Sequence, residues 1–313
     1  MSQLVAIVGP TAVGKSALAL RLAQSLDGEI VSADSRQVYR YMDIGTAKPS
    51  PEEQALVPHH LIDVVDPDED FSLAPYQEMA YQAIEDIESR GKPAILVGGS
   101  GLYVWATLGG FKIPHVPPDA AFRKSLEERA KKEGHMALYG ELEQVDPSAS
   151  QRIDPRNVRR VIRALEVFRT TGLPLSQLQS LSPLFRALVI GLATTREDLY
   201  ERIDSRVDRM MERGLVPEVE GLLKRGYGFD LPSMSGVGYQ QIGQYLNGEI
   251  DLPTAVQRIK YETHRLARHQ YAWFRPSDER IHWFDVRNGV EDSIDSLIQG
   301  FASGDIGRKN EIR

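Results

Sequence analysis

The stretch GPTAVGKS, from Gly9 to Ser16, restricts the fold of this chain more than any other part of its sequence. Its spacing is that of a P-loop, in which backbone N–H groups surround phosphate oxygens, the lysine adds positive charge and the serine hydroxyl reaches Mg²⁺. The context fits, because an apolar segment at 4–8 precedes the motif and a helical pattern at 16–26 follows it. We therefore expect a phosphate site where a strand passes into a helix.

Each position of the motif has an expected part in this site. Gly9 and Gly14 serve the path of the backbone, Lys15 binds a diphosphate and Ser16 binds a metal ion. Thr11 stands at a variable position, where its hydroxyl can bind a ligand or the loop itself, and spacing alone favours the structural role. The complete predicted phosphate site is Gly9, Pro10, Thr11, Ala12, Val13, Gly14, Lys15 and Ser16.

Apolar segments rich in β-branched residues alternate with helical patterns along most of the chain. This alternation predicts an α/β fold whose parallel sheet is covered by helices on both faces, a P-loop NTPase-like core. Helical patterns stand at 73–90, 195–214 and about 253–274, and Thr195 is the expected N-cap of the second pattern. After the first strand, the expected strands are 28–34, 60–65, 94–99, 187–192 and 281–286.

Strand patterns vanish between Gly109 and Pro183. The proline-rich KIPHVPP at 112–118 leads into charged helical patterns, which predicts an all-helical insertion in the α/β core. These helices are expected at about 119–133, 135–144 and 155–171. The expected parts of the chain are a first part of the core at 1–112, the helical insertion at 113–183, and a second part of the core with C-terminal helices at 184–313.

Composition excludes several classes of protein. The chain has no cysteine, which excludes disulfides, Cys-ligated zinc and thiol catalysis. No apolar run approaches the roughly 20 residues of a membrane-spanning helix, and the N-terminus lacks the regions of a signal peptide, so we expect a cytoplasmic enzyme with no membrane partner. The net charge of −7 argues against nucleic acid, yet residues 151–275 carry 19 Lys and Arg against 14 Asp and Glu.

Two further segments are expected at the carboxyl ends of strands, where open α/β sheets collect their ligands. VSADSRQVYR, at 31–40, would bring Asp34 near the P-loop. A carboxylate there can bind Mg²⁺, act as a general base or cap the next helix. VGGSGLYV, at 97–104, can bring backbone amides to a ligand, although a tight turn from strand to helix explains its glycines nearly as well.

Arginines gather in the insertion. Arg156, Arg159, Arg160 and Arg163 fall at i, i+3, i+4 and i+7, which would place four unpaired guanidinium groups on one helix face. Such a face is either solvated or in contact with phosphates, and the latter is favoured here. A later helical segment at 257–275 mixes arginines with aromatic residues, which suits either unpaired bases or a core helix with solvated charges.

The residues alone support two functions. One is a small-molecule kinase, with ATP in the P-loop and the insertion as a lid. The other is an enzyme acting on RNA, in which the P-loop holds a diphosphate donor and the arginines hold the nucleic acid. The basic insertion favours the second, because a lid needs one or two arginines rather than a stripe.

The motifs resemble, in content and order, those of bacterial tRNA dimethylallyltransferases. The resemblance covers about residues 4–275, and DSRQVY followed by GTAKP is its most specific part. It implies transfer of a dimethylallyl group from dimethylallyl diphosphate to N6 of the adenosine 3′ of the anticodon in tRNA, with a related enzyme of free adenine nucleotides as the closest alternative. The matching stretches are GPTAVGKS, DSRQVYRYMDIGTAKP, HHLIDV, VGGSGLY, RRVIRALEV, RIDSRVDRMMERG and LPSMSGVGYQQ.

The same resemblance implies roles for individual residues. Asp34 matches the general base, and Arg206 matches an arginine that binds the diphosphate together with Lys15 and with Mg²⁺ held partly by Ser16. Thr11 matches a position near the reacting centre, so the resemblance favours a role in the reaction over the structural role that spacing alone favours. Gln37 is expected to read an adenine edge through its amide. The matching tRNA contacts are Asp34, Ser35, Arg36, Gln37, Gly101, Arg123, Arg159, Arg160, Val161, Ile162 and Arg163. The expected partners of a monomeric enzyme are dimethylallyl diphosphate and the anticodon stem-loop of tRNA.

Overall fold

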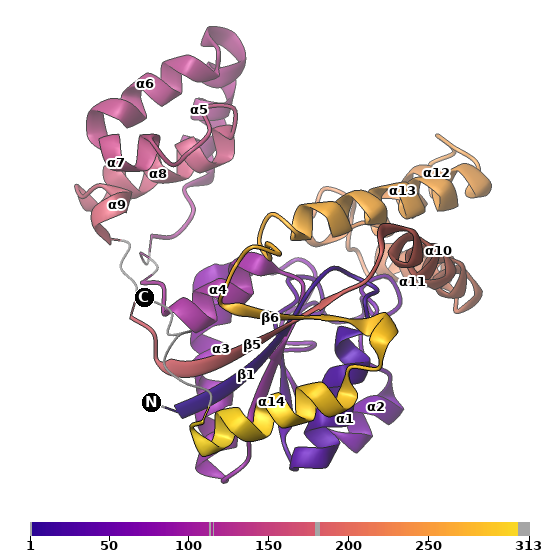
Figure 1. The fold of residues 1–313 in the computed structure, drawn as a ribbon. Helices are drawn as coiled ribbons and strands as arrows, with labels where there is room; N and C mark the ends of the chain where they lie inside the picture. The colour runs from indigo at the N-terminus through magenta and orange to yellow at the C-terminus, as the bar shows by residue number, and fades with distance from the viewer. Residues whose placement is uncertain (1, 113, 115, 179–181, 306–313) are drawn as a thin grey trace. The chain divides into compact units, whose positions relative to one another are not determined.

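The chain forms two compact units (Figure 1). The computed structural model describes residues 2–112, 114, 116–178 and 182–305. One unit consists of Met1–Leu108 and Leu184–Arg313, and the other of Gly109–Pro183. The second unit begins slightly before residue 113, where the sequence placed the boundary.

A six-stranded sheet forms the centre of the first unit, and every strand pair in it is parallel. The strand order is β3-β2-β4-β1-β5-β6. β1 pairs with β5 along its whole length, from Ser2 opposite Phe185 to Val8 opposite Gly191. The predicted parallel sheet is confirmed. Its strands are β1 (Ser2–Val8), β2 (Glu29–Ser32), β3 (His59–His60), β4 (Ala94–Val97), β5 (Phe185–Ala193) and β6 (Ile281–Asp285).

The strand expected at 60–65 is wrong beyond His60. Leu61 and Asp63 have φ values of 63° and 55°, and such left-handed backbone cannot continue a strand. The buried ammonium of Lys48 donates to the carboxylates of Asp63 and Asp43, which fixes the turn that replaces the strand. The N–H groups of Val64 and Val65 instead donate to the Val38 carbonyl oxygen, in the loop after β2.

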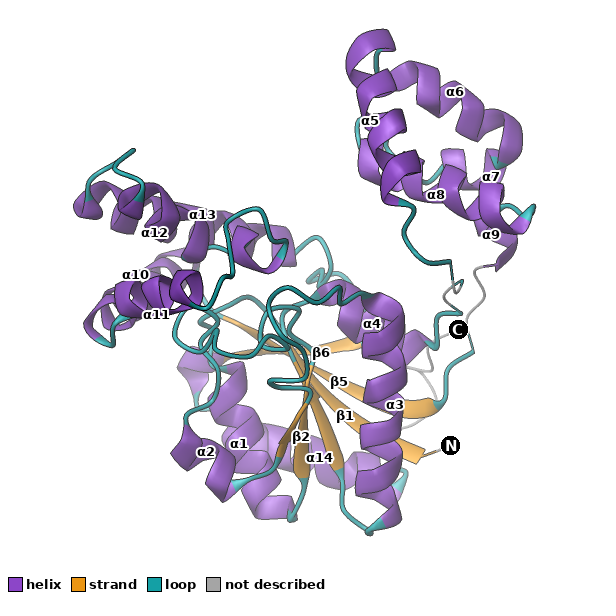
Figure 2. Ribbon diagram, turned by 180° about the vertical axis from the view of Figure 1, so that it is seen from behind, coloured by secondary structure: helices purple, strands orange, loops and turns teal. Residues whose placement is uncertain are grey.

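Helices cover both faces of the sheet (Figure 2). α1 (Lys15–Leu26) and α14 (Glu291–Ser303) lie on one face, while α3 (Leu73–Ser89) and α4 (Gly101–Gly109) lie on the other. Side chains of a strand alternate between faces, so Val5 and Ile7 of β1 join the core that contains Leu22 of α1, and their neighbours point to the opposite side. Each buried Leu or Ile side chain contributes roughly 1.5–3 kcal/mol through lost contact with water. A short helix, α2 (Pro51–Leu56), precedes β3.

A further group of helices follows β5 and packs on the loop after β2. Val38 and Met42 of that loop share a core with Val207, Leu215 and other apolar residues of these helices. The Thr195 hydroxyl accepts a hydrogen bond from the Asp198 N–H, so the predicted helix begins at its expected cap. The helices are α10 (Arg196–Glu212), α11 (Leu215–Lys224), α12 (Tyr239–Leu246) and α13 (Leu252–Gln270), with short 3₁₀ turns at Ser233–Ser235 and Val286–Asn288.

In the second unit, the elements that the described residues form are all helices, as expected. Its core contains Leu138, Leu142, Val161 and Ile162. The helices of this unit are α5 (Ala120–Glu133), α6 (His135–Val145), α7 (Pro147–Ser150), α8 (Val158–Thr171) and α9 (Leu175–Leu178).

In neither unit does a helix of the described residues have the length and hydropathy needed to cross a membrane.

Candidate active site

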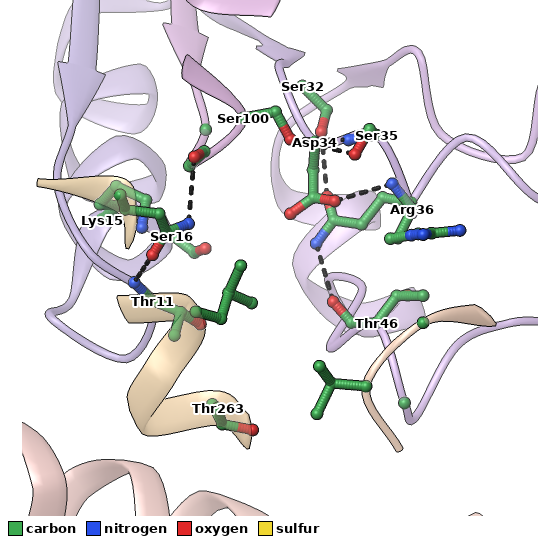
Figure 3. A pocket seen from close by; sticks show the side chains of 18 of the residues that line it. Thr11, Lys15, Ser16, Ser32, Asp34, Ser35, Arg36, Thr46, Ser100 and Thr263 are labelled. Carbon is green, nitrogen blue, oxygen red and sulfur yellow. Dashed lines mark hydrogen bonds between the residues drawn. The ribbon is translucent and has the colours of Figure 1, made fainter. Parts of the chain in front are cut away.

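A cavity of about 570 Å³ lies in the first unit, at the carboxyl ends of three adjacent strands. The P-loop follows β1, and Gly98–Gly101 follows β4. Ser32 is the last residue of β2, and Asp34–Gln37 come directly after this strand. α10 and α13 supply further walls, together with Gly45 and Thr46 of the loop after β2 and the segment Ser235–Tyr239. Figure 3 shows the labelled side chains of this cavity, Thr263 of α13 among them. The structure thus brings together residues that the sequence separates by almost 200 positions. The predicted residues that line the cavity are Thr11, Lys15, Ser16, Asp34, Ser35, Arg36, Gln37, Gly101 and Arg206.

The P-loop has the backbone that its glycines were expected to provide. Gly9 has φ 138°, and a Cβ there would lie 2.5 Å from the carbonyl oxygen of Leu192, so only glycine fits. Gly14 has φ 113° and precedes α1 without a side chain that caps the helix. The first N–H groups of α1 therefore remain available to an anion, which the helix dipole also favours. Between the glycines, Ala12 has φ 65° and Val13 is buried.

Two cations face the P-loop in a poorly hydrated space. The ammonium of Lys15 donates to the Pro10 carbonyl oxygen at 2.8 Å, and desolvation together with the charge of Arg206 lowers the pKa of Lys15 to about 7. Burial likewise lowers the pKa of Arg206, whereas the charge of Asp34 raises it. One carboxylate thus opposes two cations, and the excess positive charge suits a ligand with several negative charges.

Both the backbone and the side chain of Thr11 form hydrogen bonds. Its N–H donates to Oε1 of Gln270 at 2.7 Å, and its hydroxyl oxygen accepts from Arg206 at 3.3 Å. The backbone of Thr11 is therefore structural, while its hydroxyl lies beside the diphosphate arginine that the family resemblance indicated. Gln270 was not predicted, because the residue lies 259 positions from Thr11 and no local pattern connects the two.

Asp34 closes a turn rather than capping a helix. Its Oδ1 accepts the Arg36 N–H at 2.9 Å, and the segment that follows forms turns. Oδ2 accepts no hydrogen bond from the residues that the structure describes, and Asp34 lines the cavity. The Ser35 N–H donates to the Ser100 hydroxyl at 3.0 Å, which joins this turn to the glycine turn after β4. The Arg36 N–H thus holds one carboxylate oxygen, in a turn that is tied to the next strand's turn, and the other oxygen is available to a ligand.

The next two side chains are already engaged with protein. The guanidinium of Arg36 donates to the carbonyl oxygens of Pro232 and Ser233, at 2.8 and 3.1 Å. The Gln37 amide donates to the carbonyl oxygens of Thr46 and Ala47, which uses both of its hydrogens. Its Oε1 accepts from the Ser32 hydroxyl at 3.0 Å, so protein groups hold both ends of the amide, and the reading of an adenine edge by Gln37 stays a prediction.

Gly101 is the first residue of α4 and packs against Trp273. A Cβ at this position would approach the indole ring to 2.2 Å, so glycine is required for packing. The backbone of Gly101 still lines the cavity, as its prediction requires.

The described residues contain no group of three or more acidic, histidine or cysteine side chains that could hold a metal ion. Mg²⁺ needs no such group when it binds phosphate, because it keeps several waters and takes one or two protein oxygens. The exposed Ser16, in the first turn of α1 at the cavity wall, offers one such oxygen. The donor set fits a metal ion that arrives with a diphosphate.

In the second unit, two of the residues predicted to contact RNA, Arg123 and Arg163, pair with one carboxylate. Arg123 and Arg163 both donate to the buried carboxylate of Glu166, at 2.7 and 2.6 Å, and join α5 to α8. Burial raises the pKa of Glu166, but these arginines and the Asp119 N–H lower it to about 2. The expectation of four unpaired arginines is therefore wrong for Arg163.

The rest of the stripe is shorter than expected. α8 begins at Val158, after its cap Asn157, so Arg156 precedes the helix. Arg159 and Arg160 are exposed and form no ion pair with any described residue. The side chains of Val161 and Ile162 are buried in the core of this unit, which removes them from contact with RNA.

Comparison with known proteins gives one consistent result. The profile of a family described as IPP transferase matches residues 37–277. A tRNA dimethylallyltransferase of Roseiflexus castenholzii is 59% identical over 276 residues, which cover 88% of this chain and 90% of that one. The tRNA dimethylallyltransferase of Dehalococcoides mccartyi is 48% identical over 302 residues, or 96% of this chain and 93% of its own.

Solved structures are similar over nearly the whole chain. A tRNA isopentenylpyrophosphate transferase from Bacillus halodurans has 41% sequence identity and a TM-score of 0.72, with 97% of this chain and 96% of that chain covered. A eukaryotic dimethylallyltransferase, solved acting on tRNA, has 27% identity and a TM-score of 0.78, with 97% and 80% covered.

Proposed function

The chain belongs to the IPP transferase family, and from this premise we propose that it is a tRNA prenyltransferase. It transfers a dimethylallyl group from dimethylallyl diphosphate to N6 of the adenosine 3′ of the anticodon. The observation that supports this function most is the pairing of Asp34 with two desolvated cations, Lys15 and Arg206, around one cavity. Prenylation of an amino group needs both a base and a receptor for the leaving diphosphate.

The reaction distributes its charges between these groups. The N6 lone pair attacks C1 of the allyl group, the C1–O bond breaks, and its electron pair leaves with the diphosphate. Because the exocyclic amine is a weak nucleophile, Asp34 accepts its proton as the C–N bond forms. Lys15, Arg206 and the N–H groups of the P-loop stabilise the charge that develops on the leaving oxygen.

Mg²⁺ is the cofactor we assign to this site. Ser16 would hold it through its hydroxyl, together with diphosphate oxygens and water. When bound, the ion neutralises charge on the leaving group.

The tRNA contributes the second substrate. A stacked adenosine must leave its stack before Asp34 can reach N6, as in other enzymes that modify a base. We assign the exposed cations Arg159 and Arg160 of α8 to contacts with backbone phosphates of the tRNA. Such contacts position the nucleic acid without reading its sequence. We propose that the enzyme acts as a monomer and works in the cytoplasm, where its tRNA substrate is found.

Labelled dimethylallyl diphosphate tests this function. The protein is offered the label with unmodified tRNA, with AMP, or with ATP alone. We expect label only in tRNA, on the adenosine that follows the anticodon. Label in AMP would assign the activity to free nucleotides, and consumption of ATP with no labelled product would favour the small-molecule kinase hypothesis.

A further inference from the structure

The side chain of Gln270 connects two turns of the cavity. Gln270 is the last residue of α13, and its Oε1 accepts the Thr11 N–H of the P-loop at 2.7 Å. Its Nε2 donates to the Gly99 carbonyl oxygen, in the turn after β4, at 3.0 Å. One amide therefore fixes the separation between the P-loop and its neighbouring turn.

The orientation of this amide follows from its partners. A backbone N–H can only donate and a backbone carbonyl can only accept, so Oε1 must face Thr11 and Nε2 must face Gly99. The second hydrogen of Nε2 has no acceptor among the described residues. This free donor belongs to a residue that lines the cavity.

Gly99 shows how closely this donor approaches the phosphate site. A Cβ on Gly99 would lie 2.3 Å from Nε2 of Gln270 and 3.7 Å from the Lys15 ammonium. The amide nitrogen and the ammonium are thus neighbours over the same glycine. Any side chain at position 99 would displace the amide.

Contacts between α13 and α10 hold Gln270 in place. Three polar contacts, one per turn of α13, join the two helices, so that Gln270 and Arg206 reach opposite ends of Thr11. These contacts are Lys260 with Asp208 at 2.7 Å, His264 with Asp204 at 2.8 Å, and Arg268 with the Tyr200 hydroxyl at 2.7 Å.

We infer that Gln270 is a diphosphate-binding residue, which holds Thr11 through Oε1 and donates its second Nε2 hydrogen to a phosphate oxygen. The identity of the diphosphate compound rests on the proposed function, whereas binding of diphosphate itself does not. Leucine at this position keeps the size of the side chain but loses both hydrogen bonds.

Titration calorimetry of inorganic diphosphate with Mg²⁺ tests the inference. We expect Gln270→Leu to weaken diphosphate binding by about ten- to a hundredfold, the usual effect of losing hydrogen bonds to a charged group. Gln257→Leu, at an exposed position of the same helix, should bind as the wild type does. In the transfer reaction, Gln270→Leu should raise KM for dimethylallyl diphosphate and leave KM for tRNA unchanged.

A second variant tests the same contact from its other side. Gly99→Ala should displace the amide and also weaken diphosphate binding, and adding it to Gln270→Leu should cause no further loss. Wild-type diphosphate affinity in Gln270→Leu would overturn the inference, and so would equal losses for tRNA and diphosphate in a protein that unfolds at lower temperature. If the wild type binds diphosphate but prenylates no tRNA, the proposed function fails. The diphosphate affinity of Gln270→Leu then still tests the role of Gln270.

Discussion

At the scale of single residues, the protonation of Lys15 controls the charge of the phosphate site. Desolvation and the neighbouring Arg206 lower its pKa to about 7 in the ligand-free protein. A bound diphosphate raises this pKa again, because it favours the charged ammonium. The ammonium is therefore present below pH 7 and is lost as the pH rises above 7, so diphosphate affinity falls in that range.

We expect the diphosphate Kd of the wild type to rise by about tenfold per pH unit between pH 7.5 and 8.5. Lys15→Arg should lack this dependence, since arginine stays charged. The ratio of the two Kd values cancels the titration of the ligand itself. A ratio that stays constant with pH would show that Lys15 is fully charged before the ligand binds.

At the scale of elements, the loop between β2 and α2 is held by one carboxylate. Glu218 of α11 accepts the N–H groups of Asp43, Ile44 and Gly45 at 2.6–3.0 Å, and the Tyr239 hydroxyl at 2.7 Å. Gly45 and Thr46 of this loop line the cavity. Glu218 therefore positions a wall of the site from outside it.

Glu218→Gln should lower the free energy of unfolding by about 1.5–3 kcal/mol, because the amide replaces an acceptor with a donor that faces backbone N–H groups. Urea unfolding measures this loss. Glu220→Gln, on the same helix and without a hydrogen-bond partner among the described residues, is the matched control. Equal stability of the two variants would mean that the loop does not depend on Glu218.

Sequence patterns predicted the elements that local chemistry determines. The P-loop, five of the strands, the cap at Thr195 and the helical insertion depend on neighbouring residues and were found. The turn at Leu61–Asp63 was missed, because it depends on Lys48 rather than on its own apolar residues. Gln270, and the pairing of Arg163 with Glu166, depend on how α13 and α8 pack, which periodicity does not reveal.

At the scale of the whole molecule, an acidic chain is proposed to bind an acidic polymer. The net charge is −7, so the attraction must come from local cations such as Arg159 and Arg160, which are exposed and lack ion pairs with the described residues. Each phosphate contact releases counterions and makes binding depend on salt.

Arg159→Ala with Arg160→Ala should weaken tRNA binding and reduce the slope of log K against log salt by about one to two units. Lys131→Ala with Lys132→Ala removes the same charge from exposed positions of the same unit and should leave the slope nearly unchanged. Identical slopes in both double variants would mean that the arginines face only solvent.

The central claim is that Asp34 takes the N6 proton while the P-loop holds the leaving diphosphate. Single-turnover transfer by Asp34→Asn tests it most directly, because asparagine still accepts the Arg36 N–H and preserves the turn. We predict a rate about a hundredfold or more below that of the wild type, with tRNA and diphosphate affinities within a few fold. Transfer at the wild-type rate in Asp34→Asn would contradict the mechanism.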